Sequence, residues 1–310
     1  MIYTITLNPA LDHIIETDGF NIGETNYYNN DYIVVGGKGI NVAVVLNNLK
    51  AHVLGTGLMG EGNKDSFITK FNELNVKNNF FFFDGKTRTN FKIKNLKAKQ
   101  ETELNGLGKE VNADLLVKLK DYLKTNLDKG DIVVAAGSIP AGVPTTIYQE
   151  IGDICNQQQA LFILDTSKKQ MLEGLKAKPF LIKPNIEEIC EILGKPFREY
   201  SYEETVEMVN ELKELGAQNV LLSMGSKGSL YFQNDGSVYK TGIATGKLVN
   251  SVGSGDSMIA GFAYGLYKNL DIVRTLQYGA ACGGATAFTQ WLAEKQDIEN
   301  LVDTIKVEKL

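Results

Sequence analysis

The stretch from Val252 to Ser257 reads VGSGDS, and an apolar run from Met258 to Leu266 follows it. Glycines on both sides of a serine let the backbone turn sharply, with its N–H groups converging on one point. The helix expected behind this turn adds its positive N-terminal end. The stretch therefore predicts an anion site at a helix start, and a phosphoryl group is the anion that it suits best.

Asp256 lies in the first turn of that expected helix. Its carboxylate is a candidate base for the proton of an attacking hydroxyl. Gly253, Ser254 and Gly255 would offer amides to the negative charge that develops beside it. An aspartate at this place is also a common N-cap, so the local pattern leaves both roles open.

The composition excludes several classes of protein. The 310 residues are 43% apolar and 22% charged, as in a globular protein of one large α/β domain with insertions or of two domains. The net charge of −5, with no basic block, argues against nucleic acid. No apolar stretch approaches the ~20 residues of a membrane span. Cys155, Cys190 and Cys282 form neither a metal motif nor a disulfide framework, so we expect a cytoplasmic protein.

Helices and strands are expected to alternate over most of the chain, as in an α/β protein. Apolar β-branched runs predict strands at 2–7, 53–58, 80–83, 132–135, 161–164, 180–182 and 220–223. Helical spacing predicts helices at 64–74, 113–127, 145–155, 203–215, 258–266 and 272–288. Four phenylalanines at 80–83 indicate a strand that is covered on both faces.

Two segments do not follow this alternation. Residues 16–30 are polar and precede a short strand at 32–35. A second departure begins near residue 87 and contains strand patterns at 91–93 and 101–104. We expect these three strands to form a small separate sheet.

Candidate sugar-binding residues follow the first strand and open the first helix. Asp12 comes just past a strand end, where ligands lie in open α/β sheets, although it could equally cap a turn. Gly36 and Gly37 precede Lys38, and Asn41 lies one turn into the helix. The glycines suit either a plain strand–helix turn or the close approach of a ligand. The spacing is not that of a Walker A loop.

Other polar residues have two readings each. Arg88 suits a substrate phosphate, but a lone arginine often lies in solvent. Glu103 could face the same substrate cavity as Arg88. Asn185 and Glu188 suit Mg²⁺ through its waters, or form a capping box. The glycine turn at 224–228 could admit a nucleotide or make a hairpin.

Four ordered motifs together resemble the ribokinase-like sugar kinases, in their phosphofructokinase B branch. They are NPALD at 8–12, GGKGINVA at 36–43, KPN at 183–185 with Glu188, and VGSGDS at 252–257. Within the branch, QETELN at 100–105 and ATAF at 285–288 are most similar to bacterial kinases of fructose 1-phosphate. Kinases of tagatose 6-phosphate have almost the same motifs, and kinases of fructose 6-phosphate are a more distant alternative.

The resemblance implies a three-layer α/β/α sandwich with a β-sheet lid. The core would be 1–10, 36–86 and 106–310, and the lid 11–35 and 87–105. Family lids often pair between subunits, so the resemblance also implies a homodimer through the lid.

The resemblance also implies the ligands and the residues that bind them. A sugar phosphate would lie among Asp12, Gly37, Lys38, Asn41, Arg88, Asn90, Glu103, Ser138 and the base Asp256. ATP would lie along Lys183, Asn185, Ser223, Gly225, Ser226, Gly228, Val252, Gly253, Ser254, Gly255 and Ser257. Mg²⁺ would be held through water by Asn185 and Glu188.

Two departures and one competing class accompany the resemblance. Residues 105–108, NGLG, lack the proline that is usual there. Tyr27 stands where relatives commonly carry arginine, and no lysine or arginine precedes Lys38. The competing class is a non-catalytic sensor of sugar phosphates or nucleotides. Such a protein would be expected to have lost the base or the glycine turn, and this chain has both.

Overall fold

The core of the molecule is a ten-stranded sheet, seen in a computed structural model that describes all residues from 1 to 310. Neighbouring strands are parallel from β5 to β11, and antiparallel from β11 to β14. From one edge to the other the strands are β14 (Val307–Lys309), β13 (Val238–Thr241), β12 (Ser229–Phe232), β11 (Asn219–Ser223), β10 (Leu181–Ile182), β9 (Leu161–Asp165), β8 (Ile132–Ala136), β1 (Ile2–Thr6), β4 (Val53–Gly60) and β5 (Asn78–Phe83).

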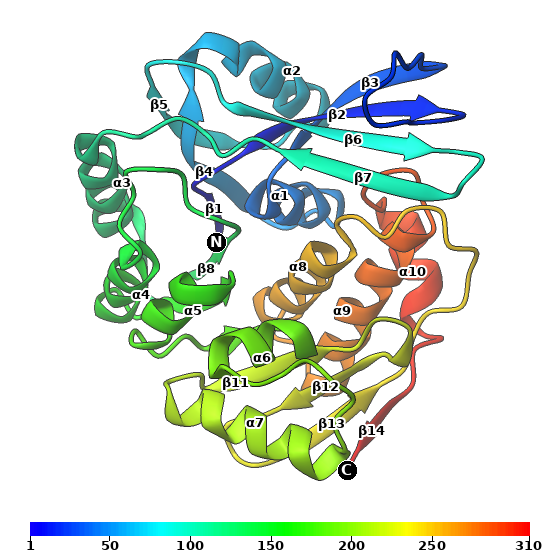
Figure 1. Cartoon of the computed structure of the whole chain (residues 1–310). Coiled ribbons are helices and arrows are strands. Elements are labelled where there is room, and N and C mark those ends of the chain that lie inside the picture. Colours follow the sequence, from blue (N-terminus) through cyan, green and yellow to red (C-terminus); the bar gives the residue numbers. More distant parts are fainter.

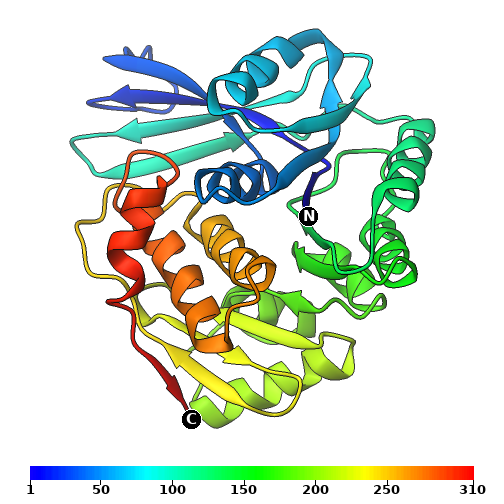
Figure 2. The same ribbon diagram turned by 180° about the vertical axis from the view of Figure 1, so that it is seen from behind.

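Helices cover both faces of this sheet, which confirms the predicted α/β/α sandwich (Figures 1 and 2). One layer contains α1 (Lys38–Asn48), α2 (Lys64–Leu74), α8 (Ser254–Tyr267), α9 (Ile272–Ala287) and α10 (Lys295–Val302). The other contains α3 (Ala113–Asn126), α4 (Ile147–Gln157), α5 (Lys168–Leu175), α6 (Ile186–Leu193) and α7 (Tyr202–Glu214). In β8, Ile132 and Val134 face the first layer while Val133 and Ala135 face the second.

A second sheet of four strands, which we call the lid sheet, projects beyond the core on the side of α8, α9 and α10 (Figure 1). Its order is β3 (Asn30–Gly36), β2 (Ala10–Thr17), β6 (Arg88–Asn95) and β7 (Gln100–Asn105). The central pair, β2 and β6, is parallel, with Asp12 opposite Asn90. Two segments that are distant in sequence therefore depend on each other for this sheet.

The strand β2 was not expected: the first strand was predicted to end at residue 7, and no strand was predicted between it and residue 32. Elements α5, α10 and β14 were also missed. The prediction for the four phenylalanines is confirmed: Phe80 stacks on Phe71 of α2 at 5.7 Å, and Phe81 meets Tyr122 of α3 at 5.9 Å between ring centroids. No helix is both long enough and apolar enough to cross a membrane.

Candidate active site

Candidate side chains gather where the parallel strands end. Asp165 is the last residue of β9, Ser223 is the last of β11, and Lys183 directly follows β10. Ser138 lies in the loop after β8. Because the carboxyl ends of parallel strands share one edge of the sheet, these residues form a single region, where ligands bind in open α/β folds.

The start of α8 presents three free backbone donors. The N-cap is Gly253, in the left-handed conformation with φ 80°, which a glycine adopts without strain. The N–H groups of Gly253, Gly255 and Asp256 donate to no protein acceptor. The N–H groups of Val252 and Ser254 already bond to neighbouring oxygens. They are therefore not free donors, although the sequence had suggested free amides along this stretch. The three free N–H groups suit a phosphate, and we call the place that they face the pocket. The buried Ser254 hydroxyl has no hydrogen-bond partner in the protein.

Ser257 does not face this pocket. Its side chain is fully buried, and its hydroxyl lies 2.8 Å from the Thr286 hydroxyl of α9. Its N–H bonds to the Gly253 carbonyl. The expectation that Ser257 contacts a nucleotide is therefore wrong, because both of its polar groups serve the packing of α8.

Asp256 is buried, with 7% of its surface exposed, and it does not cap the helix. Its Oδ2 accepts a hydrogen bond of 2.8 Å from Asn41 Nδ2, and its Oδ1 has no protein partner. Burial raises the pKa of Asp256 to about 6, while the charge of Lys38 acts in the opposite direction. A carboxylate with one oxygen fixed and one free is suited to accept a proton.

Two lysines converge on a carboxylate beside the pocket. Lys38 Nζ lies 3.1 Å from Asp165 Oδ2, and Lys183 Nζ lies 3.9 Å from Asp165 Oδ1. The buried Asp165 raises the pKa of Lys38, against the effect of burial. A Cβ at Gly255 would lie only 3.2 Å from Lys183 Nζ, so the glycine leaves room for this ammonium group beside the free amides. The sequence did not single out Asp165, because its partner Lys38 is 127 positions away.

The sugar-binding candidates of the lid form a second cluster. Asp12 Oδ1 accepts a hydrogen bond of 2.8 Å from Asn90 Nδ2, and Asp12 Oδ2 lies 3.3 Å from Lys92 Nζ. Glu103 also pairs with Lys92, at 3.7 Å. Asp12 and Asn41 line one cavity of about 180 Å³ between the lid sheet and the core. The structure thus brings the lid carboxylate and the partner of Asp256 to the same space.

The glycine before α1 has a packing role. Gly37 has φ 127°, and a Cβ there would lie 2.8 Å from a Thr6 methyl of β1. The glycine is therefore needed for the turn between β3 and α1, which is one of the two roles that the sequence had left open. The turn places Lys38 and Asn41 at the site, whereas contact of Gly37 itself with a sugar stays a prediction.

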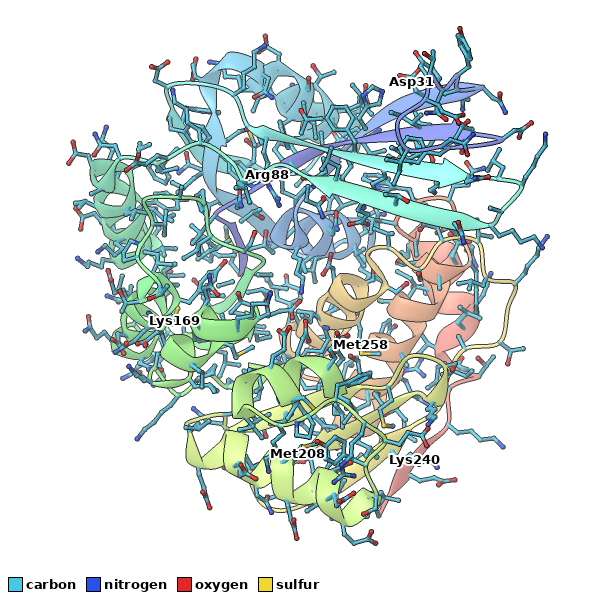
Figure 3. All side chains as sticks on the ribbon, viewed as in Figure 1. Asp31, Arg88, Lys169, Met208, Lys240 and Met258 are labelled. Atoms are coloured by element: carbon cyan, nitrogen blue, oxygen red, sulfur yellow. The ribbon has the colours of Figure 1, made fainter.

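Arg88 stands at the root of the lid sheet (Figure 3). Its guanidinium donates to the carbonyls of Pro9 at 3.3 Å, Gly106 at 2.9 Å and Asn8 at 3.2 Å. Two of its five N–H groups remain for a ligand. Asn8 Nδ2 donates to Ser138 Oγ at 3.1 Å, so Arg88 and Ser138 share one neighbour. Tyr27 is exposed in a loop of the lid.

Asn185 and Glu188 form a capping box at the start of α6. The Asn185 side chain accepts from the Glu188 N–H at 2.8 Å, and Glu188 Oε2 accepts from the Asn185 N–H at 2.9 Å. No group of three or more His, Cys, Asp or Glu side chains is placed to hold a metal ion. Glu188 Oε1 takes part in no hydrogen bond of the box, so it is the oxygen left to accept from a water of Mg²⁺.

The turn after β11 joins two antiparallel strands, so its hairpin reading is confirmed. A Cβ at Gly228 would lie 2.1 Å from the Thr241 carbonyl oxygen, so the hairpin requires a glycine there. Gly225 instead borders open space, and Ser226 is exposed. Ser223 donates from its hydroxyl to the Pro184 carbonyl at 3.3 Å. A nucleotide contact along this turn stays a prediction.

The pH dependence of kcat/KM is expected to show an acid limb near pH 6, the pKa of Asp256. The base must be ionised to act, so the rate should fall as the pH drops through this value.

The stability of the protein should depend on the same carboxyl group with the opposite sign. Stability from this carboxyl is fully present below its unfolded pKa near 3.8 and is lost as the pH rises through 6. Initial rates across this range test the assignment, and an acid limb at the ordinary aspartate pKa would contradict it.

The chain is similar to known kinases over its whole length. Residues 5–297 match the pfkB family of carbohydrate kinases. The 1-phosphofructokinase of Bacillus subtilis is 38% identical, with 100% of both chains covered. That of Borreliella burgdorferi is 34% identical, covering 100% of this chain and 99% of the relative. The structure of Escherichia coli phosphofructokinase-2 in complex with fructose-6-phosphate has a TM-score of 0.89 at 22% identity, with 98% of each chain covered, and supports the fold.

Free amides at a helix start, a buried carboxylate and two lysines at strand ends are the kinds of group that phosphoryl transfer requires. This chain belongs to the pfkB family of carbohydrate kinases.

Proposed function

We propose that this kinase transfers the γ-phosphoryl group of MgATP to the C6 hydroxyl of fructose 1-phosphate and forms fructose 1,6-bisphosphate. Two relatives named 1-phosphofructokinase, each matched over its full length, support this substrate. The observation that carries the chemistry is the free Oδ1 of buried Asp256 beside the unpaired N–H groups of Gly253 and Gly255. A proton acceptor and a site for developing charge are the two parts that the transfer requires.

Asp256 would take the proton of the acceptor hydroxyl, while Asn41 holds the other carboxylate oxygen in place. The amides of Gly253, Gly255 and Asp256 would bind the charge on the transferred group. Mg²⁺ would neutralise the nucleotide phosphates, with Asn185 and Glu188 holding it through water.

The substrate would be held from two sides. Asp12 would accept hydrogen bonds from sugar hydroxyls inside the lid cavity. The two N–H groups that Arg88 has left, together with the Ser138 hydroxyl and Lys38, would bind the phosphate that the sugar already carries. Closure of the lid sheet over this pocket would exclude water and limit ATP hydrolysis.

One kinetic panel tests the substrate. Fructose 1-phosphate, tagatose 6-phosphate and fructose 6-phosphate are each assayed with MgATP by coupled ADP release. We expect the highest kcat/KM for fructose 1-phosphate. A preference for tagatose 6-phosphate would replace the proposed substrate, and no ADP release with any of the three would favour a non-catalytic sensor.

We also propose that the kinase is a cytoplasmic homodimer that pairs through the lid sheet. A row of neighbouring residues crosses its outer face: Ile33, His13, Phe91 and Leu104, one from each strand. Ile33, Phe91 and Leu104 are 57%, 38% and 66% exposed, so this apolar row has no cover within the chain. The three buried free cysteines suit the cytoplasm.

A charge in this row should dissociate the dimer. Leu104→Lys would place an ammonium group against the partner's apolar face, so we expect a monomer by sedimentation at concentrations where the parent is a dimer. Phe197→Lys is the control, because Phe197 is 69% exposed but lies outside the lid. The proposal is wrong if the parent is itself a monomer, or if Leu104→Lys stays a dimer.

A further inference from the structure

Lys92 is a buried cation of the lid sheet that the proposed chemistry does not use. It lies on β6 and is 8% exposed. Lysine is rarely buried to this degree unless it is paired. Lys92 Nζ lies 3.3 Å from Asp12 Oδ2 and 3.7 Å from Glu103 Oε1, so it links the strands β2, β6 and β7.

The carboxylate of Asp12 is fixed at both oxygens. Oδ1 accepts from Asn90 Nδ2 at 2.8 Å, and Oδ2 faces Lys92. On the neighbouring strand, a Cβ at Gly36 would lie 2.9 Å from Oδ2, so the glycine leaves space for this orientation. The carboxylate that would meet the sugar is thus held in place by the lid alone.

We propose that Lys92 is a positioning residue for the sugar phosphate: it keeps the carboxylate of Asp12 oriented toward the hydroxyl groups of a ketose phosphate. This inference rests on the proposed function, in which Asp12 accepts hydrogen bonds from the sugar. Lys92 Nζ faces Asp12 and Glu103, and the proposed transfer assigns it neither to the phosphoryl group nor to the acceptor hydroxyl. Its loss therefore affects binding of the sugar and leaves the chemical step intact.

Electrostatics supports a role beyond ordinary packing. Without Lys92, the carboxylates of Asp12 and Glu103 would face the same small region with no cation between them. Arg88 also lies near Asp12, but its guanidinium is directed to three main-chain carbonyls. Mutual repulsion would turn Asp12 away from its present position, because like charges at short range disfavour the ionised pair.

Lys97 provides a control within the same lid sheet. It lies in the turn between β6 and β7, pairs with Asp18 at 3.3 Å, and does not line the cavity. Lys92→Met and Lys97→Met remove the same charge and leave side chains of similar length. Only Lys92→Met removes the cation beside Asp12.

Initial rates are measured for the parent and both variants, with fructose 1-phosphate and MgATP varied in turn. We expect Lys92→Met to raise the KM for fructose 1-phosphate roughly tenfold, the value of one charge-assisted bond, with kcat and the KM for MgATP nearly unchanged. Lys97→Met should match the parent. Lys92→Arg should recover most of the loss, because it keeps the charge.

A second variant covers the case in which Lys92→Met does not fold, which thermal unfolding will show. Gly36→Ala would displace the Asp12 carboxylate without removing a charge, and we expect the same selective rise in the KM for the sugar phosphate. An unchanged KM in a folded Lys92→Met, an equal rise in Lys97→Met or an unchanged KM in Gly36→Ala overturns the inference. A parent that phosphorylates no ketose phosphate refutes the proposed function instead.

Discussion

Asp256→Asn is expected to lower kcat by roughly 10²–10⁴-fold, the usual effect of removing a general base. Asparagine keeps the shape and can still accept the hydrogen bond of 2.8 Å from Asn41, so the free amides of α8 should stay in place. The KM values for both substrates should therefore change little. Single-turnover and steady-state rates measure the loss.

The same substitution should not destabilise the protein near neutral pH. Holding a buried carboxylate ionised when its pKa is raised from 3.8 to about 6 costs up to roughly 3 kcal/mol, and asparagine removes that cost. Asp271→Asn is the control: Asp271 caps α9 by accepting from the Arg274 N–H, and asparagine caps equally well. Turnover of Asp256→Asn within a few-fold of the parent would show that Asp256 is not the base.

Asp165→Asn is expected to lower the free energy of unfolding by about 3 kcal/mol, because it leaves two cations without their buried partner. Asp165 is 0% exposed and pairs with Lys38 and Lys183 at 3.1 and 3.9 Å. The substitution keeps the volume of the side chain, so the loss of stability measures the contribution of the charge. Denaturant unfolding measures it.

Asp165→Asn should also change the pH profile. The charge of Asp165 raises the pKa of Asp256, so its removal should shift the acid limb of kcat/KM to lower pH. Asp131→Asn is the matched control, since Asp131 is buried and pairs with the N-terminal ammonium group at 2.6 Å, at the other end of the sheet. That variant should leave the acid limb unchanged. If the free energy of unfolding and the pH profile of Asp165→Asn both equal those of the parent, the two lysines have found other partners.

The sequence located the turn before α8 because glycines and a helix start are local signals. VGSGDS at 252–257 predicted the turn, and α8 begins within it at Ser254. Helix α2 was predicted with its observed bounds, Lys64–Leu74, since its buried Phe67 and Phe71 follow helical spacing. The three-layer core could be predicted because strands buried on both faces are continuous apolar runs.

The features that escaped prediction depend on pairing across the fold or on side-chain direction. Strand β2 carries Asp12, His13 and Glu16, so it lacks the apolar alternation by which a strand is recognised. Asp165 gains its role from lysines that only the folded sheet brings near. Ser257 follows the pocket in sequence, but the helix turns its hydroxyl toward α9.

The parallel pairing of β2 with β6 has a consequence for biosynthesis. The hairpin of β2 and β3 leaves the ribosome with the β2 edge open, and that edge stays unpaired until Arg88–Asn95 has been made. During this interval the nascent chain exposes a strand edge and the apolar side chains next to it, which are typical sites of aggregation. Truncated chains that end before β6 are therefore expected to precipitate, and slower translation between the two segments should lower the yield of active enzyme.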